Sequence, residues 1–318
     1  MLKYIIKRTL LIFLTLFIIL TIAFFLIKLL PDYPPIDPSI DQEYHKLLLQ
    51  KYGYDKPIPV QYFLWVKNIL TSWDWGESRQ FMGRGAFEQI SGNLPVTMKI
   101  NIYSFLISMP LGFLFGIIAA LKKNKLTDQI ITFFVMLFIS APSFVVISLL
   151  VMVFAGNLGW LPIVWNQLGF PNSEILRYVI PVLALSFGPI ASLTRYTRAE
   201  LTEVLTSEYL LLARTKGLTR RQTILRHALR NSMIPLVGIV IGNFVGIIGG
   251  SVVIENIYSI PGVGGVLLNS ISTLDYNVTM AVLAFYTIIN LFAVLIVDLS
   301  YGIIDPRVRV GATKWVIK

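Results

Sequence analysis

The sequence lacks cysteine altogether, and it is poor in charged residues and in histidine. Charged residues make up 14% of the 318 positions, and the two histidines are His45 and His227. Without cysteine the chain can form no disulfide bond, thiolate metal site or catalytic thiolate. Two isolated histidines match no ligand spacing of a transition-metal site, so no metal is expected. The chain also contains no Gly-x-x-x-x-Gly-Lys-Ser/Thr loop, which excludes ATP binding by the usual route.

Apolar residues are abundant and occur in long runs. They make up 55% of the chain, and the mean hydropathy is +0.72. A helix needs about 20 apolar residues to cross the hydrocarbon core of a bilayer. Six uncharged runs approach or exceed this length: Thr9–Ile27, Ile100–Leu121, Ile130–Ala155, Tyr178–Thr194, Ser232–Ile254 and Tyr276–Val297. The first run is longer than the apolar part of a signal peptide, so it is expected to stay as an anchor. The sequence therefore predicts an all-α, multi-pass protein of the cell membrane with six transmembrane helices.

The positive charges indicate how the chain is oriented. The formal net charge is +10, a value that is also typical of nucleic-acid-binding domains. The charges lie between the apolar runs, however, and do not follow one face of a soluble domain. If the ends of the runs alternate between the two sides, 18 of the 27 lysines and arginines fall on the side of the termini. Since the cytoplasmic side collects positive charge, both termini are predicted to be cytoplasmic, and no nucleic-acid partner is expected.

The apolar runs divide the chain into parts. Residues 1–30 are the first transmembrane helix. Residues 31–95 are an external segment, in which EYHKLLLQKYG and VQYFLWVKNIL have the apolar spacing of short surface helices. Residues 96–310 are a five-helix transmembrane core that includes a cytoplasmic loop at 198–234, and residues 311–318 are a cytoplasmic tail. The external segment is either a packed cap or a docking surface for a partner.

The cytoplasmic loop contains the most informative stretch, ARTKGLTRRQTILRHALRNSMIP at 213–235, with seven basic residues and no acid. Orientation alone accounts for the charge, but not for the helix start and stop signals. Gly217 fits the left-handed residue that ends a helix starting near Ser207, and Thr219 with Gln222 forms a capping box that starts another. The second helix has one apolar stripe, made of Ile224, Leu225, Ala228 and Leu229. We therefore expect a structured, basic helix-turn-helix with one face free to pack on a partner.

This stretch and several others resemble the inner-membrane permease subunits of binding-protein-dependent ABC transporters, in the peptide and nickel branch. The other segments are DKPIPVQYFLW, NLGWLP, ENIYSIPGVGG and VDLSYGIIDPRVR, so the resemblance covers nearly the whole chain. It implies a type I ABC importer permease fold with the N-in/C-in orientation. Two departures stand out. Leu211-Leu212 replaces the Glu-Ala pair of the general permease motif, and PDYPP replaces the Gly-Pro-Asp or Gly-Asp-Pro that usually follows the first span.

In the family, the cytoplasmic loop docks in a cleft on an ATPase. The resemblance therefore assigns ATPase coupling to Glu208, Ala213, Arg214, Lys216, Gly217, Thr219, Arg220, His227 and Arg230. It also implies the partners: a homologous second permease, two cytoplasmic ATPase subunits, an extracytoplasmic solute-binding protein and membrane lipid. No enzymatic activity and no cofactor are expected in this chain, since ATP and Mg belong to the ATPase subunits.

The family branch indicates the cargo. It points to di- or oligopeptides, for which this chain would form half of the translocation pathway; nickel or a metal-chelator complex is the alternative. A self-sufficient secondary transporter is less favoured, because such a protein needs intramembrane ionisable residues and often internal repeats, and neither is evident.

Small and polar residues in the fifth and sixth runs are candidates for the pathway. Four glycines recur at every fourth position of the fifth run: Gly238, Gly242, Gly246 and Gly250. Such a series permits close packing, either within the chain or against a second permease around the pathway. Asn243 and Asn290 are intramembrane amides, which usually face protein or water, and are candidates for lining the pathway.

The segment after the fifth run is a candidate for the outer end of the pathway. SIPGVGGVLLNS combines Pro261, Gly262 and Gly264 with an apolar helix that is too short to span a membrane. Irregular backbone near the bilayer must be shielded by protein or line a cavity, so the segment is either an external gate or a surface turn. At the other end of the sixth run, Asp298 and Arg307 are expected to form a local ion pair.

Overall fold

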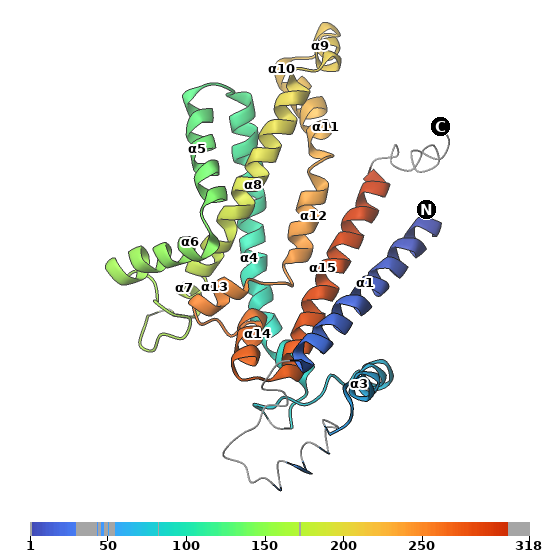
Figure 1. The fold of residues 1–318 in the computed structure, drawn as a ribbon. Coiled ribbons are helices and arrows are strands. Elements are labelled where there is room, and N and C mark those ends of the chain that lie inside the picture. The colour runs from blue at the N-terminus through green and yellow to red at the C-terminus, as the bar shows by residue number, and fades with distance from the viewer. Residues whose placement is uncertain are drawn as a thin grey trace.

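The computed structural model describes residues 2–29, 55–81, 83–171 and 173–304, with isolated positions between 43 and 50, and these residues form an almost purely helical protein. The helices are, in chain order, α1 (Leu2–Lys28), α3 (Ile58–Ser72), α4 (Ala86–Leu121), α5 (Leu126–Ser140), α6 (Ser143–Leu150), π-helical η1 (Val151–Asn157), α7 (Ser173–Leu176), α8 (Val179–Leu205), α9 (Glu208–Thr215), α10 (Arg220–Thr223), π-helical η2 (Ile224–Ala228), α11 (Leu229–Met233), α12 (Val237–Gly246), α13 (Val252–Ile257), α14 (Val263–Ser272) and α15 (Tyr276–Ile304). Figure 1 shows their arrangement.

Four helices, α1, α4, α8 and α15, are long and apolar enough to cross a membrane, and the number rises to six if each of two bent helix pairs counts as one span. Large apolar side chains on the outside of the bundle remain uncovered. Phe13 on α1 and Phe133 on α5 are both 62% exposed. Such exposure is expected of helices that face lipid, where an apolar surface costs little.

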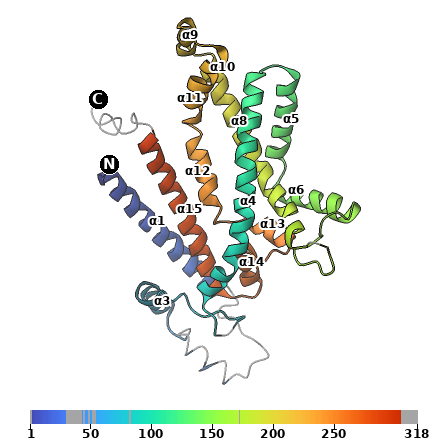
Figure 2. The ribbon, with the colours of Figure 1, turned by 180° about the vertical axis from the view of Figure 1, so that it is seen from behind.

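The third span is not the single helix that was expected from Ile130 to Ala155. The chain turns by 106° between Leu126–Ser140 and Ser143–Asn157, and α6 and η1 project sideways from the bundle (Figures 1 and 2). Pro142 explains the break. Proline has no N–H for the helix and forces the preceding residue out of the helical region, and Ala141 is indeed extended with φ −77° and ψ 119°.

The fifth span also differs from the continuous helix expected over Ser232–Ile254. Pro235 lies between α11 and α12, which are bent by 59° in the pair Arg220–Met233 and Val237–Gly246. After Gly246 the helix ends, and Gly250 has a left-handed φ of +64°. The expected series of glycines on one helical face therefore stops at Gly246, and Gly250 belongs to the turn that leads into α13.

The second span starts earlier than the expected run from Ile100. The first turns of α4 are stable beyond the apolar run because they have a hydrophobic environment of their own. Ala86 and Ile90 are buried and pack with Trp75, Val263 and Val278. α4 thereby joins the external segment to α14 and α15.

The spans form two packed groups. α4 and α5 pack against α8, whereas α1 and α12 pack against α15 (Figure 1). The contact between α4 and α8 is close because glycine stands at the crossing. A Cβ atom at Gly116 would lie 2.5 Å from the Thr197 Cβ and 2.9 Å from the Thr194 carbonyl oxygen. Backbones that approach in this way are a main source of helix attachment in lipid.

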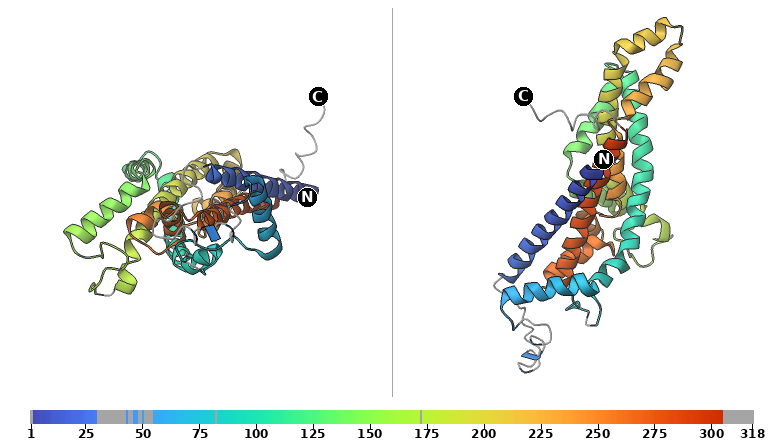
Figure 3. Two further views of the ribbon diagram at one scale, coloured as in Figure 1. Left: turned by 60° about the horizontal axis from the view of Figure 1, so that its bottom comes forward. Right: turned by 90° about the vertical axis from the view of Figure 1, so that its right-hand side faces the viewer.

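The two ends of the bundle carry different elements. The start of α1, the end of α15 and the segment α9–α10 lie at one end, which the charge pattern assigns to the cytoplasm (Figure 1). The opposite end carries α13, α14 and α3, and Figure 3 shows α3 lying across the ends of the spans. α3 contains the expected surface helix VQYFLWVKNIL, whereas EYHKLLLQKYG falls largely, and residues 311–318 entirely, outside the described residues. Asp298 pairs with Arg8 of α1 at 3.0 Å; Arg307, its expected partner, also lies outside the described residues.

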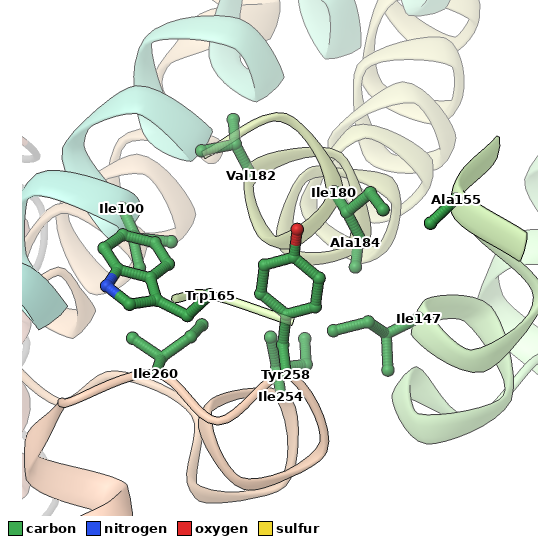
Figure 4. Packing of buried hydrophobic residues seen from close by; sticks show 10 residues of the cluster. All are labelled: Ile100, Ile147, Ala155, Trp165, Ile180, Val182, Ala184, Ile254, Tyr258 and Ile260. Atoms are coloured by element: carbon green, nitrogen blue, oxygen red, sulfur yellow. The ribbon is translucent and has the colours of Figure 1, made fainter. Parts of the chain in front are cut away.

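A hydrophobic cluster joins α8 and α13 to the loop after η1. Figure 4 shows Tyr258 and Trp165 among the isoleucines and alanines of this cluster. The hydroxyl of Tyr258 donates a hydrogen bond to the Pro162 carbonyl at 2.8 Å, and the Trp165 N–H donates to the Tyr258 carbonyl at 2.9 Å. These bonds fix the loop after η1 to the segment that follows α12.

Candidate functional site

The helices α9, α10, η2 and α11 form an elbow at the cytoplasmic end, which we call the cytoplasmic elbow (residues 207–233). Its start and stop signals are those expected from the sequence. Gly217 ends α9 with φ +91°. Thr219 caps α10: its Oγ1 accepts from the Gln222 N–H at 3.3 Å, and the Gln222 Oε1 accepts from the Thr219 N–H at 3.0 Å. Both local predictions are confirmed.

The inner face of the cytoplasmic elbow is anchored on the ends of α4 and α8. Leu210 of α9 and Ala228 of η2 pack with Ala120 of α4 and Leu201 of α8, and all are at most 3% exposed. The expected apolar stripe is narrower than its sequence suggests, because Leu225 is 54% exposed. The cytoplasmic elbow is therefore a packed structure attached to α4 and α8.

The outer face presents basic and apolar side chains together. Of the residues assigned to ATPase coupling, Ala213 and His227 are half-buried and the rest are exposed: Glu208, Arg214, Lys216, Gly217, Thr219, Arg220 and Arg230. Beside them, Leu211 and Leu212 are 59% and 57% exposed. Exposed leucines next to basic residues are typical of a surface that docks on another protein.

A buried ion pair lies close to the elbow. The guanidinium of Arg198 donates to both carboxylate oxygens of Asp128, at 2.6 and 2.8 Å, and the N–H of Asn124 donates to Asp128 at 2.8 Å. Arg198 was expected to be part of the cytoplasmic loop 198–234, but α8 continues to Leu205. The pair ties the start of α5 to α8. One feature of the sequence could have pointed to this ion pair: Asp128 is the only acidic residue between Glu88 and Glu174.

A groove lies between α4, α8 and α12, and we call it the pathway groove. Its volume is about 350 Å³, and its lining includes Asn101, Ser104, Ser108, Gly242, Asn243 and Gly246. Three residues that were candidates for the pathway thus come together. The other candidates lie elsewhere. Gly238 is buried in α12, Asn290 is exposed on α15, and Gly250 lies beside Glu255 and Thr97.

Gly242 and Gly246 face open space. A Cβ atom at either position would meet no heavy atom within 4 Å among the residues that the structure describes. Close packing within one chain, which was one of the two interpretations of these glycines, would bring a neighbouring backbone into contact here. The open space counts against that interpretation, and the other one, contact with a second permease around the pathway, stays a prediction.

The outer hairpin consists of α13, α14 and their connection, and it is built around Glu255, which we had not singled out from the sequence. This carboxylate is 3% exposed. It accepts from the Thr97 hydroxyl at 2.9 Å and from the Gly264 N–H at 2.7 Å. Burial raises the pKa of the Glu255 carboxyl, and these hydrogen bonds oppose the rise. The sequence could have pointed to Glu255 by its position, because this acid directly follows the fifth apolar run and precedes Pro261-Gly262.

The outer hairpin is packed, which counts against the simple surface turn that was one of its two interpretations; the external gate stays a prediction. Pro261 is exposed, but Gly262 and Gly264 are buried. A Cβ atom at Gly264 would lie 2.6 Å from the Val252 Cα and 2.9 Å from the Glu255 Oε2. The glycines therefore leave the space that the buried carboxylate occupies.

Replacement of Gly264 by alanine is expected to lower the stability of the hairpin by about 2 kcal/mol, because a backbone atom blocks the added methyl group. Thermal unfolding of the purified protein in detergent measures this effect. Gly92→Ala is the control: Gly92 is exposed on α4, and its Cβ would meet nothing within 4 Å. Equal melting temperatures for the two variants would contradict the packing described here.

Comparisons with known proteins agree with this architecture. Residues 112–310 match the family described as "Binding-protein-dependent transport system inner membrane component". Residues 1–83 match the model described as "Binding-prot-dependent transport system membrane comp, N-term". The two matches cover the segment that contains the cytoplasmic elbow and the spans other than most of α4, because residues 84–111 lie between them.

Curated relatives are similar over nearly the whole chain. The dipeptide transport system permease protein of Lactococcus lactis subsp. cremoris is 38% identical over 310 residues, which cover 97% of this chain and all of that protein. The oligopeptide transport system permease protein of Escherichia coli is also 38% identical, with the same coverage. The dipeptide transport system permease protein of Bacillus subtilis is 33% identical, over 97% of this chain and 98% of that protein.

A solved structure has the same fold. The crystal structure of an amino acid ABC transporter with histidines superposes with a TM-score of 0.52 at 15% identity, over 68% of this chain and 94% of that chain. At this identity the similarity concerns the fold alone.

Proposed function

The chain belongs to the family of binding-protein-dependent transport system inner membrane components, and on this basis we propose that it is the permease subunit of an ATP-driven importer of di- or oligopeptides. It forms part of the route through the membrane and catalyses no reaction. The full-length similarity to dipeptide and oligopeptide permeases supports peptides as the cargo.

The geometry of the cytoplasmic elbow carries the mechanical part of the proposal. Its outer face offers exposed leucines and basic residues to an ATPase, while Leu210 and Ala228 fix its inner face to α4 and α8. A displacement of the elbow is therefore passed to both spans as a rigid-body movement. Alternating access requires such a two-state element, which a partner can bias.

The remaining subunits follow from this role. The description of the family names its dependence on a binding protein, and the resemblance to ABC permeases implies ATP hydrolysis by a partner. We place two ATPase subunits, with their ATP and Mg, under the elbows of this chain and of a homologous second permease. The binding protein then docks on the external end, where α3 and the outer hairpin lie.

Reconstitution tests this function. We expect the complex of both permeases and both ATPases in proteoliposomes to take up labelled tetra-alanine only when ATP and the binding protein are present, and this chain alone to take up none. Replacement of Leu211 and Leu212 by aspartate should reduce co-elution with the ATPases at least about tenfold, since it removes the apolar part of the docking face. Leu70→Asp, at an 80% exposed position on α3, is the control. ATP-independent uptake by this chain alone would refute the proposal.

A further inference from the structure

We propose that the pathway groove binds the main chain of an extended peptide, through the side-chain oxygens of Asn101 and Asn243. The inference rests on the proposed function, because it takes peptides as the cargo. It adds a site for them within this subunit, one that depends on no side chain of the peptide.

In both amides the nitrogen is already hydrogen-bonded, which leaves the oxygen as the acceptor. Asn101 Nδ2 donates to the Thr97 carbonyl at 2.7 Å, and Asn243 Nδ2 donates to the Ile239 carbonyl at 2.8 Å. Each bond uses a carbonyl four residues earlier in the same helix, so it orients the amide. Within the described part of the chain, neither Oδ1 accepts a hydrogen bond.

Free acceptors at this depth need a partner. Asn101 and Asn243 lie inside the second and fifth apolar runs, and an amide oxygen in hydrocarbon without a donor is costly. Both residues line the pathway groove. The groove must therefore supply donors, either from water or from whatever passes through.

The rest of the lining excludes recognition by charge. Among the residues that the structure describes, no charged side chain borders the groove, and its other polar members are Ser104 and Ser108. Ser104 accepts from the Ser186 hydroxyl at 3.1 Å, and Ser108 donates to the Phe105 carbonyl at 3.4 Å. Two uncharged acceptors can bind the N–H that peptide bonds carry whatever the side chain is, provided the residue is not proline.

The rival occupant is a helix of the second permease, and the chemistry disfavours it. Beyond its first turn a helix has no free N–H group to donate, whereas an extended peptide offers one at every residue except proline. Gly242 and Gly246 leave room for a peptide beside the amides. The volume of about 350 Å³ also falls within the range of small-molecule pockets, roughly 300–1,000 Å³.

The test compares a peptide with an analogue that lacks the donors. Asn101→Leu and Asn243→Leu each remove an acceptor at nearly constant volume, and each should lower the uptake of tetra-alanine by about threefold to tenfold, the effect of one hydrogen bond. Backbone N-methylated tetra-alanine has no inner N–H groups, so its slower uptake should not fall further in these variants. The affinity of the isolated binding protein for both peptides is measured separately, and Asn157→Leu at an exposed position of η1 is the matched control.

A labelling experiment separates the two occupants. Because the chain has no cysteine, Asn243→Cys creates a single thiol in this subunit, in complexes whose other subunits are made cysteine-free. We expect a charged thiosulfonate to label it and tetra-alanine to slow that labelling, whereas Phe133→Cys on the lipid-facing side of α5 should stay unlabelled. A thiol that the thiosulfonate fails to label, with or without peptide, would overturn the inference. So would normal uptake of tetra-alanine by both leucine variants. A wild-type complex that takes up no peptide would instead refute the proposed function.

Discussion

Replacement of Arg198 by alanine is expected to destabilise the protein by about 3 kcal/mol, because it leaves the buried Asp128 carboxylate without its partner. The side chain of Asp128 is 4% exposed, whereas that of Arg198 is 32% exposed. The remaining donors, chiefly the Asn124 N–H, cannot replace a bidentate guanidinium. The loss should separate α5 from α8 at the cytoplasmic end.

The difference in burial makes the prediction asymmetric. Asp128→Ala should cost less than Arg198→Ala, because the arginine it leaves behind can reach water. The double variant should be more stable than Arg198→Ala alone, since it contains no buried unpaired charge. Thermal unfolding in detergent measures all three. Glu174→Ala is the control: it removes an ion pair with Arg177 in which Glu174 is 82% exposed, so it should cost under about 1 kcal/mol. A double variant as unstable as Arg198→Ala would show that the pair does not act in this way.

Apolar runs predicted the spans well where each run forms one continuous helix, and less well at prolines. Pro95 and Pro110 lie inside α4, and Pro189 lies inside α8. Pro142 and Pro235 instead stand where helices break. All of these residues remove a helix hydrogen bond, so the outcome depends on whether neighbouring helices hold the chain straight. That information is tertiary, and the composition of a run does not contain it.

In the candidate site too, features that depend on nearby residues could be predicted from the sequence, and features that depend on distant residues could not. Gly217 and the capping box of Thr219 were predictable because their partners lie within a few residues. The buried acids were not. Asp128 bonds across 70 residues and Glu255 across 158. Charge patterning places an acid near the end of a span, but only the packing of the spans decides which partner it meets.

Gly217→Val is expected to uncouple ATP hydrolysis from transport. Gly217 has φ +91°, a conformation that a β-branched residue avoids at a cost of at least about 1–2 kcal/mol. A Cβ atom there would meet nothing within 4 Å, so the effect comes from the backbone alone. Relief of the strain turns α10 relative to α9, while the buried contacts of Leu210 and Ala228 hold the inner face in place. The docking face is then distorted on an elbow that remains attached.

The measurement is the number of ATP molecules hydrolysed per peptide taken up by the reconstituted complex. We expect Gly217→Val to raise this ratio about tenfold or more, since about 1.4 kcal/mol of misalignment corresponds to a factor of ten. Gly217→Asn is the matched control, because asparagine adopts the left-handed conformation more readily and should keep the ratio near that of the wild type. If valine and asparagine raise the ratio equally, the side chain acts by contact with the ATPase; if neither does, the turn at Gly217 has no part in coupling. Only a higher ratio for Gly217→Val than for Gly217→Asn shows that the backbone conformation of this residue sets the angle at which the cytoplasmic elbow contacts the ATPase.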